Sequence, residues 1–258
     1  MTMPHLPEGL IKPGQVEPYH TELFVPRYRA METGDWRLQL VPLSLGRGYW
    51  SGTWVVQDMV VLTRSRPEGG RATWMSLSPM EIESQEIGCR AAAGHTVVMG
   101  LGMGWAAANA ALHPAVTRVT VVERDPVIIA MIAAQGIFGQ LPAAAAAKLE
   151  VVEGDALEFV PALPADRLLA DIWQPLITPG RVEEVQRMAA HCQATRVYFW
   201  GQEMEIARHL RGAGLAFDAD GIAAAVSALG LPLLGPELPD YPDRIRRADA
   251  QWLRDRAS

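Results

Sequence analysis

The feature that most constrains this chain is a glycine-rich loop that follows an apolar segment. Val97-Val98-Met99 leads directly into three alternating glycines, Gly100, Gly102 and Gly104. In a doubly wound α/β sheet, ligands lie at the carboxyl ends of the strands, and glycines there let the backbone approach the ligand closely. The loop amides and the N-terminus of a following helix favour a polar ligand. The stretch therefore predicts a nucleotide-type site, with a purely structural turn as the alternative.

The sequence around this loop alternates between strands and helices. Strands are predicted at residues 96–99, 119–122, 149–152, 168–172 and 195–200, with helices between them, one of them a short helix capped by Asp155. Apolar strands separated by helices imply a parallel sheet that is covered on both faces. We therefore expect a doubly wound, Rossmann-like α/β domain over residues 80–258. Its tail beyond Gly214 reads as mostly helical and shows no clear β-hairpin.

The N-terminal part differs from the rest of the chain in composition and periodicity. Residues 1–35 contain five prolines and little periodicity, which predicts an arm that covers a site or a partner, or else a loosely ordered terminus. Residues 36–79 are rich in Val, Leu, Thr and Trp and are punctuated by glycines, which predicts a small antiparallel β domain. Ser78-Pro79-Met80-Glu81 matches a capping box and predicts a helix that runs to about Ala92.

Composition narrows the function classes. Of 258 residues, 49% are hydrophobic and 20% charged, so the chain can bury a sizeable core. Its net charge of −6 argues against a general nucleic-acid or membrane-surface binder. No apolar run is long enough for a membrane span and the first 12 residues lack a signal-peptide pattern, so the expected location is the cytoplasm. Two cysteines and six histidines without metal-ligand spacing exclude a disulfide scaffold and predict no metal site.

Two acidic residues stand where a nucleoside would need them. Glu123 ends the second predicted strand, 23 residues after Gly100, where a carboxylate can accept both hydroxyls of a ribose. Asp155 ends the third strand, where it can accept from an adenine amino group or act as a plain helix cap with Glu158. Trp105 occupies the place of the third glycine of a dinucleotide loop, which favours an adenosyl ligand and argues against a dehydrogenase.

These motifs resemble a known superfamily. Gly100-Leu101-Gly102-Met103-Gly104, Val122-Glu123-Arg124-Asp125 and Gly154-Asp155-Ala156 look like the successive motifs of class I S-adenosylmethionine-dependent transferases. Within that class the chain is most similar to the spermidine synthase (polyamine aminopropyltransferase) branch, through the Glu-x-Asp motif, the β-rich N-terminal domain, and Asp171 followed by Pro175. The resemblance covers roughly residues 80–200 well and the N-terminal β region only in outline.

The resemblance implies a methyltransferase-like fold and a cofactor, S-adenosylmethionine or its decarboxylated form. Gly100, Gly102 and Gly104 would approach the methionine part, Glu123 the ribose, and Asp155 the adenine. It also suggests a homodimer.

The reaction depends on the loop after the fourth predicted strand. The resemblance implies that Asp171 holds and deprotonates an attacking amine, whereas a plain strand-end acid is the alternative. Gln174 stands where the branch has a second aspartate, and residues 80–85 lack its tyrosine. Trp173 can stack on a flat acceptor or lie against a cation, or it can simply pack, and the same holds for Trp105.

We therefore predict an S-adenosylmethionine-dependent transferase with Asp171 and Trp173 as catalytic residues. A methyltransferase that acts on a small-molecule acceptor is favoured, because methyl transfer mainly needs alignment of the reacting atoms. No Asn-Pro-Pro-aromatic tetrapeptide or Pro-Cys nucleophile is present in the strand-end loops, which argues against methylation of nucleic-acid bases. The alternatives are an aminopropyltransferase that uses decarboxylated S-adenosylmethionine, and a non-catalytic nucleotide-binding or interaction protein of the same fold.

Overall fold

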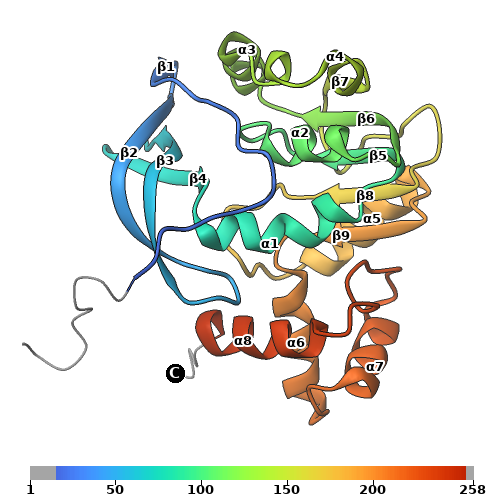
Figure 1. Cartoon of the computed structure of the whole chain (residues 1–258). Coiled ribbons are helices and arrows are strands. Elements are labelled where there is room, and N and C mark those ends of the chain that lie inside the picture. Colours follow the sequence, from blue (N-terminus) through green and yellow to red (C-terminus); the bar gives the residue numbers. More distant parts are fainter. Residues whose placement is uncertain (1–15, 254–258) are drawn as a thin grey trace, which may run out of the picture.

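The computed structural model describes residues 16–253, which form two β-sheets with helices around the second (Figure 1). The first sheet is antiparallel, with the order β1-β2-β3-β4. Its strands are β1 (Met31–Thr33), β2 (Trp36–Arg47), β3 (Thr53–Ser65) and β4 (Arg71–Ser76). The small antiparallel sheet predicted for residues 36–79 is thus present. β3 continues through Asp58, which adopts a positive φ of 48° without ending the pairing with β2.

The second sheet is parallel, with the order β7-β6-β5-β8-β9. Its strands are β5 (Gly94–Met99), β6 (Val116–Glu123), β7 (Leu149–Glu153), β8 (Arg167–Ala170) and β9 (Arg196–Phe199). The chain runs from β5 outward to β7 and then returns to the other side of β5 with β8. The strand order therefore reverses next to β5, and this switch point is where doubly wound sheets bind their ligands. The predicted Rossmann-like α/β fold is confirmed.

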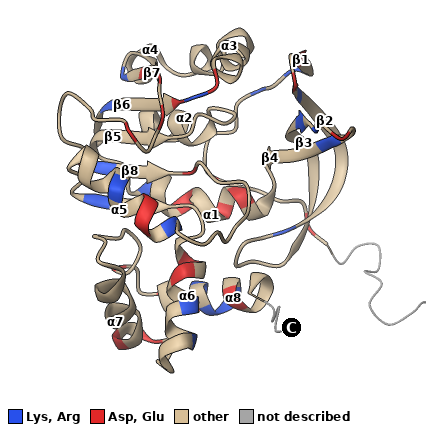
Figure 2. Cartoon of the chain, turned by 180° about the vertical axis from the view of Figure 1, so that it is seen from behind, with Lys and Arg blue, Asp and Glu red and all other residues tan. Residues whose placement is uncertain are grey.

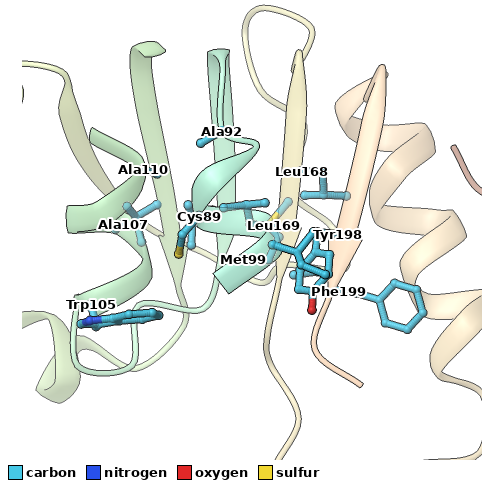
Figure 3. Close-up of a cluster of buried hydrophobic side chains, with 14 of the residues drawn as sticks. Cys89, Ala92, Met99, Trp105, Ala107, Ala110, Leu168, Leu169, Tyr198 and Phe199 are labelled. Carbon is cyan, nitrogen blue, oxygen red and sulfur yellow. The ribbon is translucent and has the colours of Figure 1, made fainter. Parts of the chain in front are cut away.

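Helices cover both faces of the parallel sheet, as Figures 1 and 2 show from opposite sides. α1 (Pro79–Arg90) and α2 (Trp105–Leu112) lie on one face, and α5 (Arg181–Cys192) lies on the other. α3 (Pro126–Gln135) and the short α4 (Ala143–Ala146) lie beside β6 and β7. A buried apolar cluster between α1, α2 and the sheet includes Cys89, Trp105 and Leu169 (Figure 3). Both cysteines are free and buried.

The start of α1 differs from the capping box in one respect. The Ser78 hydroxyl caps the helix by accepting the Glu81 N–H, as expected, and Pro79 is the first helical residue. The Glu81 side chain does not reach back to Ser78. It accepts the N–H of Ser76 instead, at 2.9 Å, because the chain enters the helix directly from β4.

The short helix expected after Asp155 is absent. Asp155 opens a turn and not a helix, and Glu158 pairs with Arg187 of α5 instead of completing a capping box. α5 begins at Arg181, where Gly180 is the N-cap in a left-handed conformation with φ +81°.

The chain after β9 forms a helical layer of α6 (Gln202–Ala213), α7 (Ala219–Leu229) and α8 (Tyr241–Trp252). In the described residues beyond Gly214 there is no β-hairpin, as expected. A single parallel bridge between Leu233 and Val197 extends the sheet beside β9.

The described part of the N-terminal arm runs along the α/β domain. The backbone of Phe24 exchanges two hydrogen bonds with the Asn109 side chain, and the Tyr28 hydroxyl donates to the Met103 carbonyl at 3.0 Å. Residues 1–15 of the expected arm lie outside the described residues. None of the described helices is long and apolar enough to cross a membrane. Within residues 16–253 no group of three or more His, Cys, Asp or Glu side chains is arranged to hold a metal ion.

Candidate functional site

A deep cleft lies between the antiparallel sheet and the carboxyl ends of the parallel strands. It contains about 1410 Å³ of empty space, part of it open to solvent. The predicted site residues that line it are Gly100, Gly102, Glu123, Asp155, Asp171 and Trp173.

The three loop glycines have different structural roles. Gly100 has a φ of +96°, and a Cβ added there would lie 2.1 Å from the carbonyl oxygen of Asp171. Gly102 faces β4, where its Cβ would lie 2.5 Å from the sulfur of Met75. Gly104 is the left-handed N-cap of α2 and faces Ile132, and it does not line the cleft. Only the first two glycines therefore border the space where a ligand would bind.

Glu123 connects the end of β6 to the glycine loop. Its Oε2 accepts the N–H of Leu101 at 3.0 Å, and its Oε1 accepts the N–H of Asp125 at 2.9 Å. Each carboxylate oxygen has a second lone pair, so the side chain can still accept a hydroxyl from the cleft. The neighbouring Asp125 caps α3 and also accepts the indole N–H of Trp36 at 2.8 Å, which ties the antiparallel sheet to the cleft.

Asp155 lies at the end of β7, on the same side of the cleft as Glu123. Its Oδ1 accepts the N–H of Leu157 at 2.9 Å, and its Oδ2 accepts no hydrogen bond from residues 16–253. Since β6 and β7 are adjacent in the sheet, the two carboxylates form one half of the cleft, which suits the sugar and base of a nucleoside.

Asp171 follows β8 and lies in the other half of the cleft. Its Oδ2 accepts the side-chain N–H of Gln85 from α1 at 2.5 Å. Burial raises the pKa of Asp171 to about 7, although the charge of Arg181 and the hydrogen bond from Gln85 both act to lower it. A carboxyl group with a pKa near 7 is well suited to accept a proton at neutral pH.

Glu81 lies close enough to Asp171 for the two charges to interact. Burial raises the pKa of Glu81 well above its usual range, the N–H of Ser76 lowers it, and the Asp171 charge raises it further. Both carboxyls line the cleft but are largely enclosed by protein, and this enclosure disfavours their charged forms.

Trp173 is fixed by its surroundings. Its indole N–H donates to Glu184 at 2.5 Å, and the guanidinium of Arg181 lies 4.6 Å from its ring centroid. The side chain of Gln174 leaves the site and donates to the carbonyl of Thr73 in β4 at 2.8 Å. The loop after β8 is therefore attached to the antiparallel sheet, and Trp173 presents an aromatic wall to the cleft.

Trp105 combines burial with an unused donor. Only 3% of the residue is exposed, it lines the cleft beside the glycine loop, and its indole N–H has no partner among the described residues. A buried donor without a partner is costly, and this N–H is also sealed from solvent in the cleft.

Several lining residues were not assigned by the sequence analysis. They are Glu81 and Gln85 of α1, Trp36 and Trp74 of the antiparallel sheet, and Trp200 after β9. The spacing of four between Glu81 and Gln85 places them on one face of a helix, and this signal was available. Nothing in the sequence indicated that this face would meet the end of β8.

Comparison with known proteins gives similarity to solved structures only. No model of a protein family matches the chain, and no curated protein matches it. Part of the chain is similar to the DhpI complex with S-adenosylhomocysteine (TM-score 0.32, 15% identity, 42% of this chain and 48% of that chain). It is also similar to the glycopeptide N-methyltransferase MtfA with S-adenosylmethionine (TM-score 0.32, 17% identity, 43% of this chain and 47% of that chain). A third structure is a putative RNA methyltransferase from Pyrococcus horikoshii (TM-score 0.34, 19% identity, 46% of this chain and 57% of that chain). The matched region spans about half the length of each of these chains.

Proposed function

We propose that the protein is an S-adenosylmethionine-dependent methyltransferase that acts on a small-molecule acceptor. The observation that carries the proposal is the division of one cleft into two halves. Glu123 and Asp155 line one half at the ends of β6 and β7, and Asp171 lines the other at the end of β8. The glycine loop lies between them, at the switch point of the sheet.

The residues of the cleft fit this cofactor. Glu123 has free lone pairs for the ribose hydroxyls, and Asp155 can accept from the adenine amino group. Gly100 and Gly102 leave the backbone bare where the methionine part would pass. When bound, the cofactor would supply a methyl group on a positively charged sulfur.

The chain's own residues would position the acceptor, accept its proton and enclose the cleft. Asp171 orients the acceptor and takes its proton, while Trp173 and Trp200 bound the acceptor half with aromatic surfaces. The antiparallel sheet covers the cleft with Trp36, Trp74 and Met75 and limits the access of water.

Calorimetric titration with S-adenosylmethionine and with its decarboxylated analogue tests the proposal. We expect a dissociation constant in the micromolar range for intact S-adenosylmethionine, which corresponds to about −8 kcal/mol. Glu123→Gln should weaken binding at least about tenfold, because a charge-assisted hydrogen bond contributes about 1.5–3 kcal/mol. Glu150→Gln is the matched control, since Glu150 lies on β7, pairs with Arg118 and does not line the cleft.

The other outcomes identify the alternatives. Tighter binding of the decarboxylated analogue would favour an aminopropyltransferase. Binding of neither compound would contradict both enzymatic functions and leave a non-catalytic protein of the same fold. The homodimer implied by the family resemblance stays a prediction, which the mass of the protein in solution would check.

A further inference from the structure

Two carboxyl groups and an amide converge in the acceptor half of the cleft. Glu81 lies in the first turn of α1, Gln85 lies one turn later, and both line the cleft together with Asp171. Gln85 donates to Oδ2 of Asp171, so the face of α1 that carries Glu81 is directed toward the end of β8. Glu81 and Asp171 are therefore neighbours in space, although 90 residues separate them in the sequence.

Each of these carboxyl groups has one oxygen held by the protein and one without a partner. Oε2 of Glu81 accepts the N–H of Ser76, and Oδ2 of Asp171 accepts from Gln85. Within residues 16–253, neither Oε1 of Glu81 nor Oδ1 of Asp171 accepts a hydrogen bond, and neither atom is sealed from solvent. Both oxygens are thus open to a molecule that enters the cleft.

The charges around the pair indicate how it is protonated. No Lys, Arg or His side chain forms an ion pair with either carboxyl in the described part of the chain. Arg181 of α5 acts on Asp171 through its charge and lowers its pKa, whereas Glu81 receives only a backbone N–H. Two adjacent carboxyls in an enclosed cleft do not both ionise readily. Burial and the Asp171 charge both raise the pKa of Glu81, whereas the Arg181 charge acts to lower that of Asp171, so a single proton shared by the pair is favoured on Glu81.

Aromatic rings border this pair. Trp173 and Trp200 line the same cleft, and the Arg181 guanidinium lies 4.6 Å from the first ring centroid and 5.6 Å from the second. That guanidinium donates to the carbonyls of Pro175, Leu176 and Trp200, so it holds the loop in place. The rings leave flat apolar surface beside two polar oxygens.

We propose that Glu81 and Asp171 are an acceptor-binding pair for an uncharged, flat molecule that carries a hydroxyl nucleophile next to a second oxygen, as in a catechol ring. This assignment rests on the proposed methyltransferase function and names its substrate class. The Asp171 carboxylate accepts the proton of the attacking hydroxyl, and the Glu81 carboxyl donates a hydrogen bond to the neighbouring oxygen. A new O–C bond forms as the S–C bond breaks, the electron pair of that bond goes to sulfur, and the hydroxyl proton goes to Asp171.

The pair is poorly suited to a polyamine. With one proton shared between them, Glu81 and Asp171 carry a single negative charge, and the nearby Arg181 offsets part of it. A polycation gains little there and must give up its hydration, since removing an ion from water is costly.

Binding of simple probes to the protein saturated with S-adenosylhomocysteine tests the pair. Calorimetry should show that catechol binds at least tenfold more tightly than phenol, which lacks the second oxygen, and that spermidine binds more weakly than catechol. Glu81→Gln keeps a hydrogen-bond donor and should retain catechol affinity within about threefold. Glu81→Ala should lose at least tenfold for catechol and leave phenol unchanged. Equal losses in the two variants, no preference for catechol over phenol, or tighter binding of spermidine would each overturn the proposal.

Infrared difference spectroscopy tests the pair without any cofactor, so its outcome is independent of whether the protein binds S-adenosylmethionine. At pH 7 the spectrum of wild type minus Glu81→Gln should contain the C=O band of a protonated carboxyl group. Glu86→Gln is the control on the same helix, because Glu86 pairs with Arg90 outside the cleft, and its difference spectrum should contain only carboxylate bands. A carboxylate band for Glu81 would show that the group is charged and overturn the proposal.

Discussion

Replacing Glu203 with glutamine should stabilise the protein above neutral pH. Glu203 lies in the first turn of α6 and has no exposed surface. The hydroxyls of Tyr49, Tyr198 and Tyr241 lie 3.1–3.3 Å from its carboxyl oxygens. Tyr49 lies in the loop between β2 and β3, Tyr198 in β9 and Tyr241 in α8. The cluster therefore joins three parts of the molecule around a single acid.

The size of the effect follows from the pKa of this acid. Burial raises the pKa of Glu203 from 4.5 to about 7, although the hydrogen bonds of the tyrosines act to lower it. Between these values the native state keeps a proton that the unfolded chain releases, so stability falls as the pH rises from about 4.5 to 7. At about 1.4 kcal/mol for each pH unit, the loss is about 3 kcal/mol. A glutamine at this position cannot ionise, so the variant does not lose this stability as the pH rises.

Urea denaturation of both proteins between pH 4.5 and 8.5 measures this difference. The free energy of unfolding of Glu203→Gln relative to wild type should become more favourable by about 3 kcal/mol across that range. Glu183→Gln is the control, since Glu183 is an exposed acid on α5. A difference between Glu203→Gln and wild type that does not change with pH would refute the reasoning, because it would mean that Glu203 has the same pKa in the folded and unfolded chains.

Three further predictions concern the cleft. Gly100→Ala should destabilise the protein by more than about 2 kcal/mol and abolish cofactor binding, because the added Cβ would meet the Asp171 carbonyl oxygen at a positive φ. Thermal unfolding measures the stability and calorimetry the binding. Gly139→Ala is the control and should change neither quantity, because nothing lies within 4 Å of the Cβ it would add. If Asp171 is the base, kcat/KM should fall as the pH drops below about 7. Arg181→Met should move the midpoint of this pH profile upward, because the Arg181 charge lowers the pKa of Asp171. An unchanged midpoint would exclude an effect of the Arg181 charge on Asp171. Trp105→Phe removes an indole N–H that is sealed from solvent, so it should leave the affinity for S-adenosylmethionine within about threefold, and a tenfold loss in calorimetry would show that the ligand reaches that N–H.

The sequence was sufficient to predict the fold because the signals are local. Apolar strands, glycines at their ends and capping residues such as Ser78 and Asp125 act within a few neighbours, and the parallel sheet, α1 and α3 follow them. The predictions failed where a tertiary contact competed. Glu81 bonds to Ser76 instead of closing the capping box, and the segment after Asp155 stays a turn, with Glu158 paired to α5.

The two halves of the cleft also differ in how far local sequence signals predict them. Gly100, Gly102, Glu123 and Asp155 occupy the carboxyl ends of consecutive parallel strands, so their spacing in the sequence was enough to place them at one edge of the sheet. The acceptor half joins Glu81 and Gln85 of α1, Asp171 after β8 and Trp200 after β9. Their proximity depends on how α1 packs across the sheet and on how Arg181 and Gln174 hold the loop after β8. Side-chain packing between elements distant in sequence has no local signature, so only the tertiary structure decided that Glu81 and Asp171 line the same cleft.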